Sequence, residues 1–256
     1  MAAIYIPAAG LVFLWLFIVY SRRTGMILKI IEAVIPELRR PKKDDRIIVF
    51  SPHPDDEIIS SAGIIFESLE AGAKVKVVIV TDGNKRGLKR TRRNESLLAG
   101  KVIGLNKDDI IFWDFPDGRL FEHSDDMIKK VAAEIGAFRP TIVIFPSPSD
   151  YHRDHTSLGI AVSAFLHGDK FDGLKLEYLI HYPAFPAPKK YAPKRSLIPP
   201  VKLFAPHKRK WRKLTLSKEA MNAKEKSVRR FRTQLAVPRL GKLLLSFVRK
   251  NELFLE

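Results

Sequence analysis

The chain has 256 residues, of which 46% are hydrophobic and 29% charged, enough apolar sequence to bury one substantial core. It contains no cysteine, which excludes disulfides and thiolate metal ligands, so any transition metal must bind to His and carboxylate side chains. The net charge of +17 lies almost wholly in residues 183–256, which carry 20 Lys and Arg against 4 Asp and Glu. Such a segment favours anionic partners: lipid head groups, phosphorylated substrates or nucleic acid.

Residues 1–23 are predicted to be a transmembrane anchor. The first 20 residues contain no charged side chain, and about 20 apolar residues cross a bilayer core as a helix. Trp15 suits the membrane interface, and Arg22 and Arg23 follow the apolar run, which predicts a single-pass membrane protein with the remaining chain on the cytoplasmic side. A cleaved signal peptide, which would carry its positive charge before the apolar run, and a buried core helix are the alternatives.

Residues 24–45 are predicted to be an amphipathic segment and a linker. Residues 26–38 have apolar side chains at helical spacing, which predicts a helix that lies on a bilayer or packs on the globular part. Residues 39–46 are rich in charge and lead into one domain, residues 46–256, which includes the basic region 183–256.

From residue 46 onward, apolar runs of strand length alternate with helical patterns. Strands are predicted at 46–50, 74–81, 109–115, 141–145 and 176–182. Helices are predicted at 56–71, 91–103, 125–138, from about 154, and at 217–235. This alternation implies parallel strands joined by right-handed crossovers, so we predict an α/β fold with a doubly wound, mostly parallel sheet.

Two segments that follow predicted strands combine histidine with carboxylates. Residues 51–57 read Ser-Pro-His-Pro-Asp-Asp-Glu, and residues 152–155 read His-Arg-Asp-His. In a doubly wound sheet, functional residues gather beyond the carboxyl ends of the strands, so the two segments should meet at one edge. Three nitrogen and oxygen ligands leave a coordination position open for water, which is the arrangement of a catalytic zinc. The metal lowers the pKa of that water towards ~7, and a carboxylate beside it can accept the proton.

Helix capping is the alternative interpretation of these carboxylates. Asp55, Asp56 and Glu57 begin a predicted helix, where carboxylates cap free N–H groups and oppose the helix dipole. Two clusters at the same predicted sheet edge favour a metal site over capping alone. The remaining histidines are predicted to be surface or core residues: His123, His167, His181 and His207. The candidate exception is His181, because it ends a predicted strand.

The segments Pro52–Glu57 and His152–His155 together resemble the paired motifs of the PIG-L (LmbE-like) de-N-acetylase family. The similarity runs from about Arg46 to the end of the chain. Further matches in order and spacing are Thr81-Asp82-Gly83, Arg92 with Glu95, Pro116-Asp117-Gly118, and Lys226, Gln234 and Glu252 to Phe254 in the tail. The resemblance implies a Rossmann-like fold and a hydrolase that removes the acetyl group from an N-acetylglucosamine-type amine.

The family pattern also implies the metal ligands and the base. It implies that His53, Asp56 and His155 bind Zn²⁺ and that Asp55 is the general base for the metal-bound water. Since a set of two histidines and one aspartate accepts several metals, Fe²⁺, Co²⁺ and Mn²⁺ are alternatives to zinc.

Four further residues complete the site that the resemblance implies. His152 is expected to stabilise the oxyanion and to protonate the leaving amine, and Asp154 to orient His152. Arg92 and Asp117 are candidate sugar contacts; an exposed helix arginine and a turn aspartate are the alternatives.

Three functions are therefore compared. The favoured one is a membrane-bound, zinc-dependent N-deacetylase of a lipid-linked N-acetylglucosamine-type sugar, whose basic region 183–256 is attracted to an anionic membrane surface. The second is a deacetylase of a soluble N-acetylglucosaminyl small molecule. The third is a non-catalytic membrane scaffold whose basic region binds lipid or nucleic acid, although the complete set of candidate site residues disfavours it.

Overall fold

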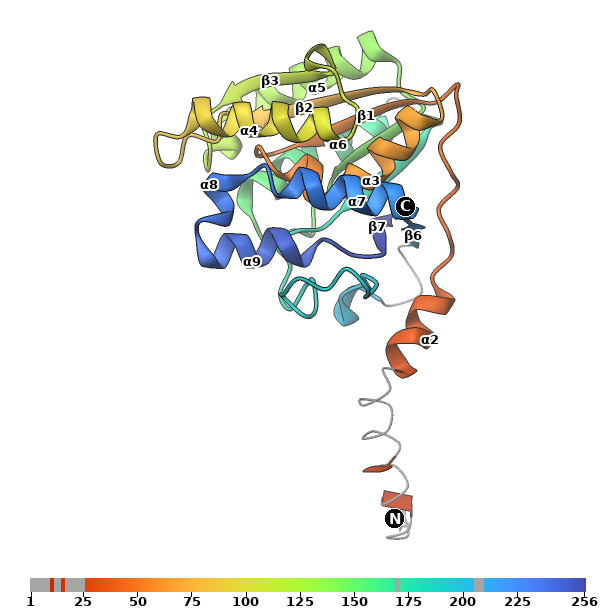
Figure 1. The fold of residues 1–256 in the computed structure, drawn as a ribbon. Helices are drawn as coiled ribbons and strands as arrows, with labels where there is room; N and C mark the ends of the chain where they lie inside the picture. Colours follow the sequence, from red (N-terminus) through yellow and green to blue (C-terminus); the bar gives the residue numbers. More distant parts are fainter. Residues whose placement is uncertain (1–9, 12–14, 17–25, 169–170, 205–209) are drawn as a thin grey trace, which may run out of the picture. The chain divides into compact units, whose positions relative to one another are not determined.

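The computed structural model describes residues 10–11, 15–16, 26–168, 171–204 and 210–256 (Figure 1). The chain divides into two units, Met1–Pro36 and Glu37–Glu256. The first unit contains α2 (Met26–Val34), which lies within the predicted helical segment 26–38. The second unit contains the sheet, the helices that cover it, and every candidate site residue.

The predicted single-pass membrane localisation is wrong, and the predicted transmembrane helix is not supported. Of residues 1–23, only residues 10, 11, 15 and 16 are described, so most of the predicted anchor lies outside the described residues. Within the described part of the chain, no helix combines the length and the apolar character that a membrane span requires. The uncharged composition of residues 1–20 does not by itself establish a continuous helix of about 20 residues.

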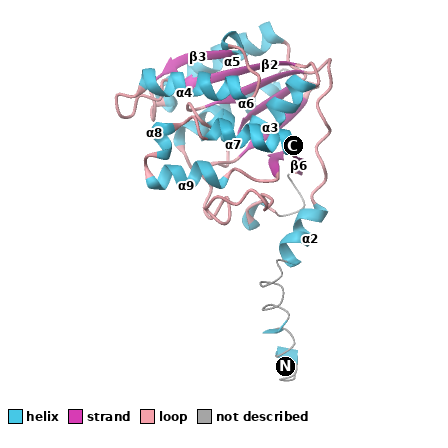
Figure 2. Ribbon diagram, in the orientation of Figure 1, coloured by secondary structure: helices cyan, strands magenta, loops and turns pink. Residues whose placement is uncertain are grey.

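The described chain forms one mixed sheet of seven strands in the order β3-β2-β1-β4-β5-β7-β6. Figure 2 shows the strands in magenta and the helices around them in cyan. Five strands are parallel: β1 (Arg46–Ser51), β2 (Lys74–Thr81), β3 (Ile110–Phe115), β4 (Ile142–Pro146) and β5 (Leu174–Tyr178). At the other side, β7 (Asn251–Leu255) runs antiparallel to β5, and β6 (Trp211–Thr215) runs antiparallel to β7. The chain proceeds outward from β1 to β3 and returns to β4, so the parallel part is doubly wound, and the predicted α/β fold is confirmed.

The helices cover both faces of the sheet (Figure 1). On one face, α5 (Ser124–Phe138) packs beside α6 (Arg153–Gly168); on the other, α3 (Asp56–Glu70) and α4 (Lys89–Val102) pack beside α7 (Lys218–Val228). The C-terminal region adds α8 (Arg232–Leu235) and α9 (Pro238–Ser246). Short 3-10 helices lie at Lys107–Asp109, Leu120–His123 and Val201–Leu203.

The structure differs from the sequence prediction mainly in the C-terminal region. Strands β6 and β7 were not predicted, because each is five residues long and pairs only with strands that lie far away in the sequence. The single helix predicted at 217–235 is two helices, α7 and α8, separated at 229–231, where Phe231 turns inward and is fully buried. Strand β5 ends at Tyr178 rather than at residue 182.

The core explains why the central strands have continuous apolar runs. Alternate residues of β1, such as Ile48 and Phe50, join the cluster under α5 and α6, and the intervening Ile47 and Val49 are equally buried. Parallel strands that are covered by helices on both faces need apolar residues at every position. Each fully buried side chain of this size contributes roughly 1.5–3 kcal/mol to folding.

The basic C-terminal region is anchored to α3 by a buried ion pair. Lys224 Nζ lies 2.6 Å from Glu252 Oε1, and both side chains are almost completely buried. The Glu252 carboxylate also accepts the backbone N–H groups of Gly63 (2.7 Å) and Ile64 (2.9 Å) in α3. Residues on α7 and β7 are thereby tied to the helix that begins at Asp56, so this part of the region belongs to the fold.

Helix α6 crosses the loop after β4 at Gly159. A Cβ at Gly159 would lie 2.9 Å from the backbone nitrogen of Pro148 and still closer to the carbonyl oxygen of Pro146. Real Cβ atoms do not approach backbone atoms so closely, and backbone cannot move aside as a flexible side chain does. The absence of a side chain at Gly159 therefore allows α6 to approach β4 closely.

We predict that Gly159→Ala destabilises the protein, while Gly136→Ala does not. The first change forces α6 away from the loop after β4, at a cost of about 1–3 kcal/mol. The second adds a Cβ at an exposed position of α5, where no atom lies within 4 Å, and replaces glycine inside a helix, which stabilises by up to about 1 kcal/mol. Urea unfolding of the two variants measures both changes; equal stabilities would contradict the prediction.

Candidate metal centre

Three side chains from the two predicted loops converge on one oxygen atom. Asp56 Oδ2 lies 3.0 Å from His53 Nδ1 and 3.0 Å from His155 Nε2. Asp56 is the first residue of α3, while His155 lies in the first turn of α6. Ligands about 2.0–2.1 Å from a tetrahedral zinc are separated by roughly 3.3 Å, so each of the two histidine nitrogens has a suitable spacing from the Asp56 oxygen. Ligand atoms also converge in three groups among the described residues: His53 with His152 and His155, Asp56 with His155 and His181, and His53 with Asp117 and Asp154.

The buried ring of His155 provides a further test of whether a metal fits. His155 is completely buried, and neither ring nitrogen makes a hydrogen bond within the described residues. The nearest carboxylate oxygens are Asp56 Oδ2, 3.0 Å from Nε2, and Asp150 Oδ2, 3.5 Å from Nδ1. A buried polar atom without a hydrogen bond costs about 1–3 kcal/mol. A cation between Nε2 and Asp56 would satisfy both groups, so the donor set fits a divalent metal.

Asp154 contacts His53 rather than the predicted His152. Its Oδ2 lies 3.0 Å from His53 Nε2 and accepts the N–H of Gly118 at 2.7 Å, while Oδ1 accepts the N–H of Leu120 at 3.1 Å. The link from Asp154 to His152 is instead made by the backbone, whose N–H donates to His152 Nδ1 at 3.3 Å. A carboxylate on the far nitrogen of an imidazole fixes the ring and its tautomer, so the carboxylate of Asp154 orients His53.

Asp150 organises the other side of the cluster and was missed in the sequence. Its Oδ1 accepts the N–H of His152 at 3.0 Å, and its Oδ2 accepts the N–H groups of Ile180 (2.9 Å) and His181 (3.0 Å). The same Oδ2 lies 3.5 Å from His155 Nδ1. Asp150 therefore joins the loop before α6 to the segment after β5. Its position near His152 is the only local signal, because the other backbone partners lie about 30 residues away.

Arg92 is a buried partner of Asp55 and not an exposed helix arginine. Its Nη2 donates to Asp55 Oδ2 at 3.2 Å and to the carbonyl of Pro54 at 2.7 Å, and its Nη1 lies 3.5 Å from Asp117 Oδ2. Asp55 has a φ of 123°, which is rare outside glycine, and its N–H donates to Glu57 Oε2 at 2.9 Å. Arg92 and Glu57 together hold Asp55 in this strained conformation.

The carboxylates make the cluster attractive to positive charge. Burial opposes a charge on His155, but Asp56 and Asp150 outweigh it and raise the pKa of His155 to about 10. Burial likewise opposes a charge on His53, but Asp154 and Asp56 raise its pKa to about 9. Imidazoles that are this basic will bind a proton or, in its place, a metal cation.

At Asp55 and His152, burial outweighs the neighbouring charges of opposite sign, so the pKa of each group moves in the direction that favours its neutral form. Burial raises the pKa of Asp55 to about 8, although the Arg92 guanidinium opposes the shift. Burial, together with the neighbouring imidazoles of His53 and His155, lowers the pKa of His152 to about 4. His152 is therefore a neutral imidazole at pH 7, and its Nδ1 is the acceptor of a hydrogen bond.

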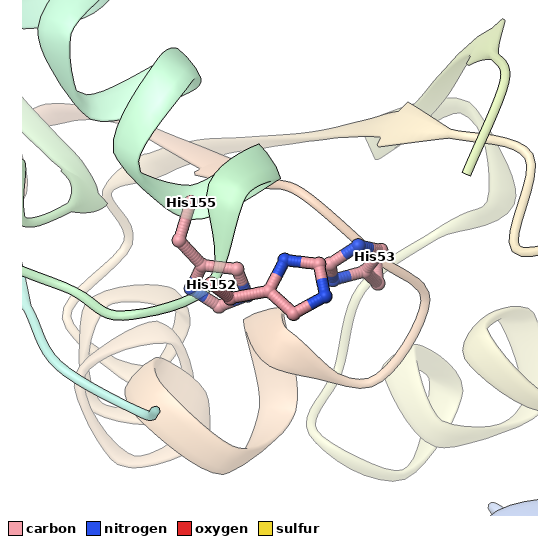
Figure 3. Close-up of side chains that lie close together, drawn as sticks. All are labelled: His53, His152 and His155. Carbon is pink, nitrogen blue, oxygen red and sulfur yellow. The ribbon is translucent and has the colours of Figure 1, made fainter. Parts of the chain in front are cut away.

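Figure 3 shows the rings of His53, His152 and His155 lying close together. Ring centres are 4.7 Å apart for His53 and His152, and 5.3 Å apart for His152 and His155. The rings of His53 and His152 line a pocket of about 610 Å³, which Asp55, Arg92 and Asp117 also line, whereas His155 is fully buried behind it. All eight predicted site residues are thus brought into one region, and Asp154 lies buried behind the pocket.

The pocket has a different character towards its outer end. Helix α9 contributes Leu240, Leu243 and Leu244, which we call the leucine face of α9. Besides the buried Arg92, five exposed basic residues line the same pocket: Lys85, Arg86, Lys189, Arg239 and Lys242. His181 also lines the pocket. Its position agrees with the prediction that, among the isolated histidines, this one is the candidate for a functional role.

In a doubly wound α/β domain, ligands bind beyond the carboxyl ends of the strands, and a set of His and Asp ligands with an open position is the arrangement of a catalytic metal. Residues 48–166 match a family model described as PIG-L, GlcNAc-PI de-N-acetylase. The matched residues include both His-containing motifs, 51–57 and 152–155, so this region is similar to the PIG-L deacetylases. This confirms the family predicted from the paired motifs and, at the level of the family, the metal-dependent deacetylase class.

Solved structures with the same fold include three deacetylases. The A40926 pseudoaglycone deacetylase Dbv21 is 18% identical, with a TM-score of 0.61 over 82% of this chain and 96% of that chain. The N,N'-diacetylchitobiose deacetylase from Pyrococcus horikoshii is 20% identical, with a TM-score of 0.56 over 93% and 92%. The zinc-inhibited form of teicoplanin deacetylase Orf2 is 17% identical, with a TM-score of 0.55 over 75% and 85%. At these identities, the likeness establishes the shared fold.

We predict that Arg92→Gln destabilises the metal-free protein by about 3 kcal/mol or more, because it leaves the buried carboxylates of Asp55 and Asp117 without their cation. The matched control is Arg93→Gln in the same helix. Arg93 is partly exposed and pairs with Asp114 at 3.3 Å, so its loss should cost at most about 1 kcal/mol. Urea unfolding of both variants tests the difference. A similar small loss for both would show that Arg92 is not a buried counterion.

Proposed function

We propose that the chain removes the N-acetyl group from an N-acetylglucosamine-type sugar, with a divalent metal held by His53, Asp56 and His155. The observation that carries this proposal is the single Asp56 oxygen that lies 3.0 Å from a nitrogen of each histidine. The substrate class is supported by the family description, GlcNAc-PI de-N-acetylase, and by the N,N'-diacetylchitobiose deacetylase of the same fold.

Zinc suits two nitrogen ligands and one oxygen ligand, although Fe²⁺, Co²⁺ and Mn²⁺ also bind such sets. When bound, the metal polarises a carbonyl and lowers the pKa of its water towards about 7. The carboxylates of Asp154 and Asp150 lie on the far nitrogens of His53 and His155, at 3.0 and 3.5 Å. They keep both rings in the orientation that a metal requires, and outer partners of this kind typically change metal affinity 10–100-fold.

Asp55 is the proposed general base. Asp55 lines the pocket next to Asp56 but is not one of the three proposed metal ligands. The Arg92 guanidinium holds its carboxylate in place by a hydrogen bond. Asp55 accepts a proton from the attacking water as the oxygen of that water joins the amide carbon. The C–N bond then breaks, and the same proton passes from Asp55 to the leaving amine. The products are acetate and the free amino sugar.

His152 is proposed to stabilise the oxyanion. Its Nδ1 accepts the backbone N–H of Asp154, so the neutral ring carries its own proton on Nε2. That N–H is a fixed donor for the negative charge that develops on the amide oxygen. Donors placed in this way typically contribute 10²–10³-fold to kcat. As a hydrogen-bond donor to the oxyanion, His152 needs no carboxylate to orient it. The carboxylate of Asp154 contacts His53 instead.

The outer pocket supports an aglycone with both an apolar and an anionic part. The leucine face of α9 offers apolar surface, and Arg239 and Lys242 of the same helix are exposed beside it. A phosphate-bearing, lipid-linked sugar has this combination of properties, which is the reason to favour it. A soluble N-acetylglucosaminyl compound is the second candidate, because the metal end of the pocket requires only the acetylated sugar.

We predict that Asp55→Asn retains the metal but loses most turnover. The amide cannot accept a proton, and general-base catalysis typically supplies 10²–10⁴-fold in rate. Metal content measured beside acetate release from N-acetylglucosaminyl substrates separates binding from chemistry. The wild-type protein at the same metal content is the reference for both measurements. Near-normal turnover in a metal-replete variant would refute the assignment of the base.

We predict that Lys242→Glu lowers kcat/KM about tenfold for a substrate with a phosphate in the aglycone, since a hydrogen bond to a charged group contributes about 1.5–3 kcal/mol. An uncharged glycoside of N-acetylglucosamine should be affected much less. Lys218→Glu, which reverses an exposed charge outside the pocket, is the matched control. Equal losses for both substrates would contradict an anionic aglycone at this end of the pocket, without affecting the metal chemistry.

A further inference from the structure

Arg249 is a buried cation without a role in the chemistry proposed above. Its side chain is completely buried, and within the described residues it pairs with no carboxylate. The guanidinium donates only to backbone carbonyls: Nε to Ser246 at 2.7 Å, Nη2 to Pro188 at 2.6 Å and Lys190 at 3.3 Å, and Nη1 to Ala192 at 3.3 Å. Burial lowers the pKa of Arg249 to about 10, so the group stays charged at pH 7. Because a buried charge requires hydrogen bonds, these contacts hold the backbone that supplies them.

Three of the four carbonyls belong to a proline-rich segment. Residues 183–200, all of which the structure describes, form no helix or strand, and the prolines among them have no backbone N–H to donate. A ladder of backbone hydrogen bonds cannot hold such a segment, so its position depends on contacts from elsewhere in the chain. We call residues 188–192 the loop wall, because Lys189 lines the pocket. Arg249 supplies three contacts to the loop wall.

Lys189 stands between the two carbonyls that accept from Arg249 Nη2. These carbonyls belong to its neighbours on either side in the chain, so the guanidinium fixes the backbone that carries the Lys189 side chain. The remaining contact of Arg249 is to the carbonyl of Ser246, the last residue of α9, where the helix dipole also favours a cation. One side chain therefore ties the loop wall to the C-terminal end of α9.

The two elements that Arg249 joins supply cations to the outer end of the pocket. Lys189 comes from the loop wall, while Arg239 and Lys242 come from α9, and all three are exposed. Within the described residues, the carboxylates that line the pocket belong to its metal end: Asp55, Asp56 and Asp117. Cations that have no carboxylate beside them in a pocket attract an anionic ligand. The outer end is therefore suited to a phosphate group.

We propose that Arg249 is a positioning residue for substrate recognition, which fixes the loop wall so that Lys189 binds a phosphate group in the aglycone. This inference rests on the proposed function, because it concerns the part of the substrate beyond the acetylated sugar. Arg249 is completely buried and acts through Lys189 without touching the substrate. Its planar guanidinium reaches four carbonyls with three nitrogens, and the single amine of a lysine cannot reproduce these contacts.

The test compares two substrates of the full-length, zinc-loaded protein: an N-acetylglucosaminyl glycoside whose aglycone carries a phosphate, and the same glycoside without the phosphate. Lys189→Gln should lower kcat/KM about tenfold for the phosphate-bearing substrate, since a hydrogen bond to a charged group is lost. The loss should appear in KM with kcat unchanged, because the phosphate contact is the same before and during the reaction. The uncharged substrate should show no such loss.

Lys194→Gln is the matched control for Lys189→Gln. Lys194 is exposed in the same proline-rich segment but does not line the pocket, so its loss should affect neither substrate.

Arg249→Lys tests the positioning role. The variant should fold, as circular dichroism can verify, and should show the same rise in KM for the phosphate-bearing substrate alone. A double variant with Lys189→Gln should lose no more than the larger of the two single losses, because both changes remove the same phosphate contact. Independent effects would instead multiply to about a hundredfold.

Several outcomes would overturn the positioning role. Equal losses for both substrates in Arg249→Lys, or failure of this variant to fold, would show that Arg249 has a general structural role. Wild-type kinetics in Arg249→Lys or in Lys189→Gln, or a multiplied loss in the double variant, would also overturn the proposal. All of these outcomes leave the proposed deacetylase function intact. That function fails separately, if the wild-type protein releases no acetate from either glycoside.

Discussion

The site depends on the parallel pairing of β1 with β4. Ile47, Ile48 and Val49 lie opposite Ile142, Val143 and Ile144, although about 95 residues separate them. Neighbouring parallel strands end at the same edge of a sheet, so the loop after each strand begins beside the other. The core residues of both strands are buried on both faces, which prevents a shift in register. Apolar packing thereby brings His53 and His155 to one carboxylate.

Each proposed histidine ligand has a carboxylate behind it that also holds distant backbone. Asp154 joins His53 to the backbone of Gly118 and Leu120, and Asp150 joins the loop before α6 to residues 180 and 181. Buried carboxylates are stable in such places because several N–H groups donate to them. The same contacts couple the loops after β3, β4 and β5, so the orientation of the rings depends on the whole sheet edge.

The parts that the sequence predicted are those with a local pattern. The buried runs of β1, β2 and β4 and the two His-containing motifs are continuous in sequence, so the fold class and the eight candidate residues could be identified. The histidine that Asp154 contacts could not be predicted from the sequence. Whether it is His53 or His152 depends on the position of the loop after β1 in the folded chain. Asp150 and His181 act through contacts between segments about 30 residues apart, and β6 and β7 pair across still longer separations. The prediction of a membrane span, which the described residues do not support, treated the absence of charge as evidence for a continuous helix.

The metal end and the outer end of the pocket are mechanically connected through the C-terminal region. Asp56 begins α3, and the middle of α3 donates two N–H groups to Glu252, whose carboxylate is paired with Lys224 of α7. The chain between Lys224 and Glu252 contains α9, with its leucine face on the pocket. Because a buried ion pair is costly to break once formed, α3 and the ends of this segment keep a fixed relation. The fold therefore fixes the position of the leucine face of α9, which would contact the aglycone, relative to the metal ligands. With this position fixed, the pocket can select substrates by the distance between their acetyl group and their aglycone.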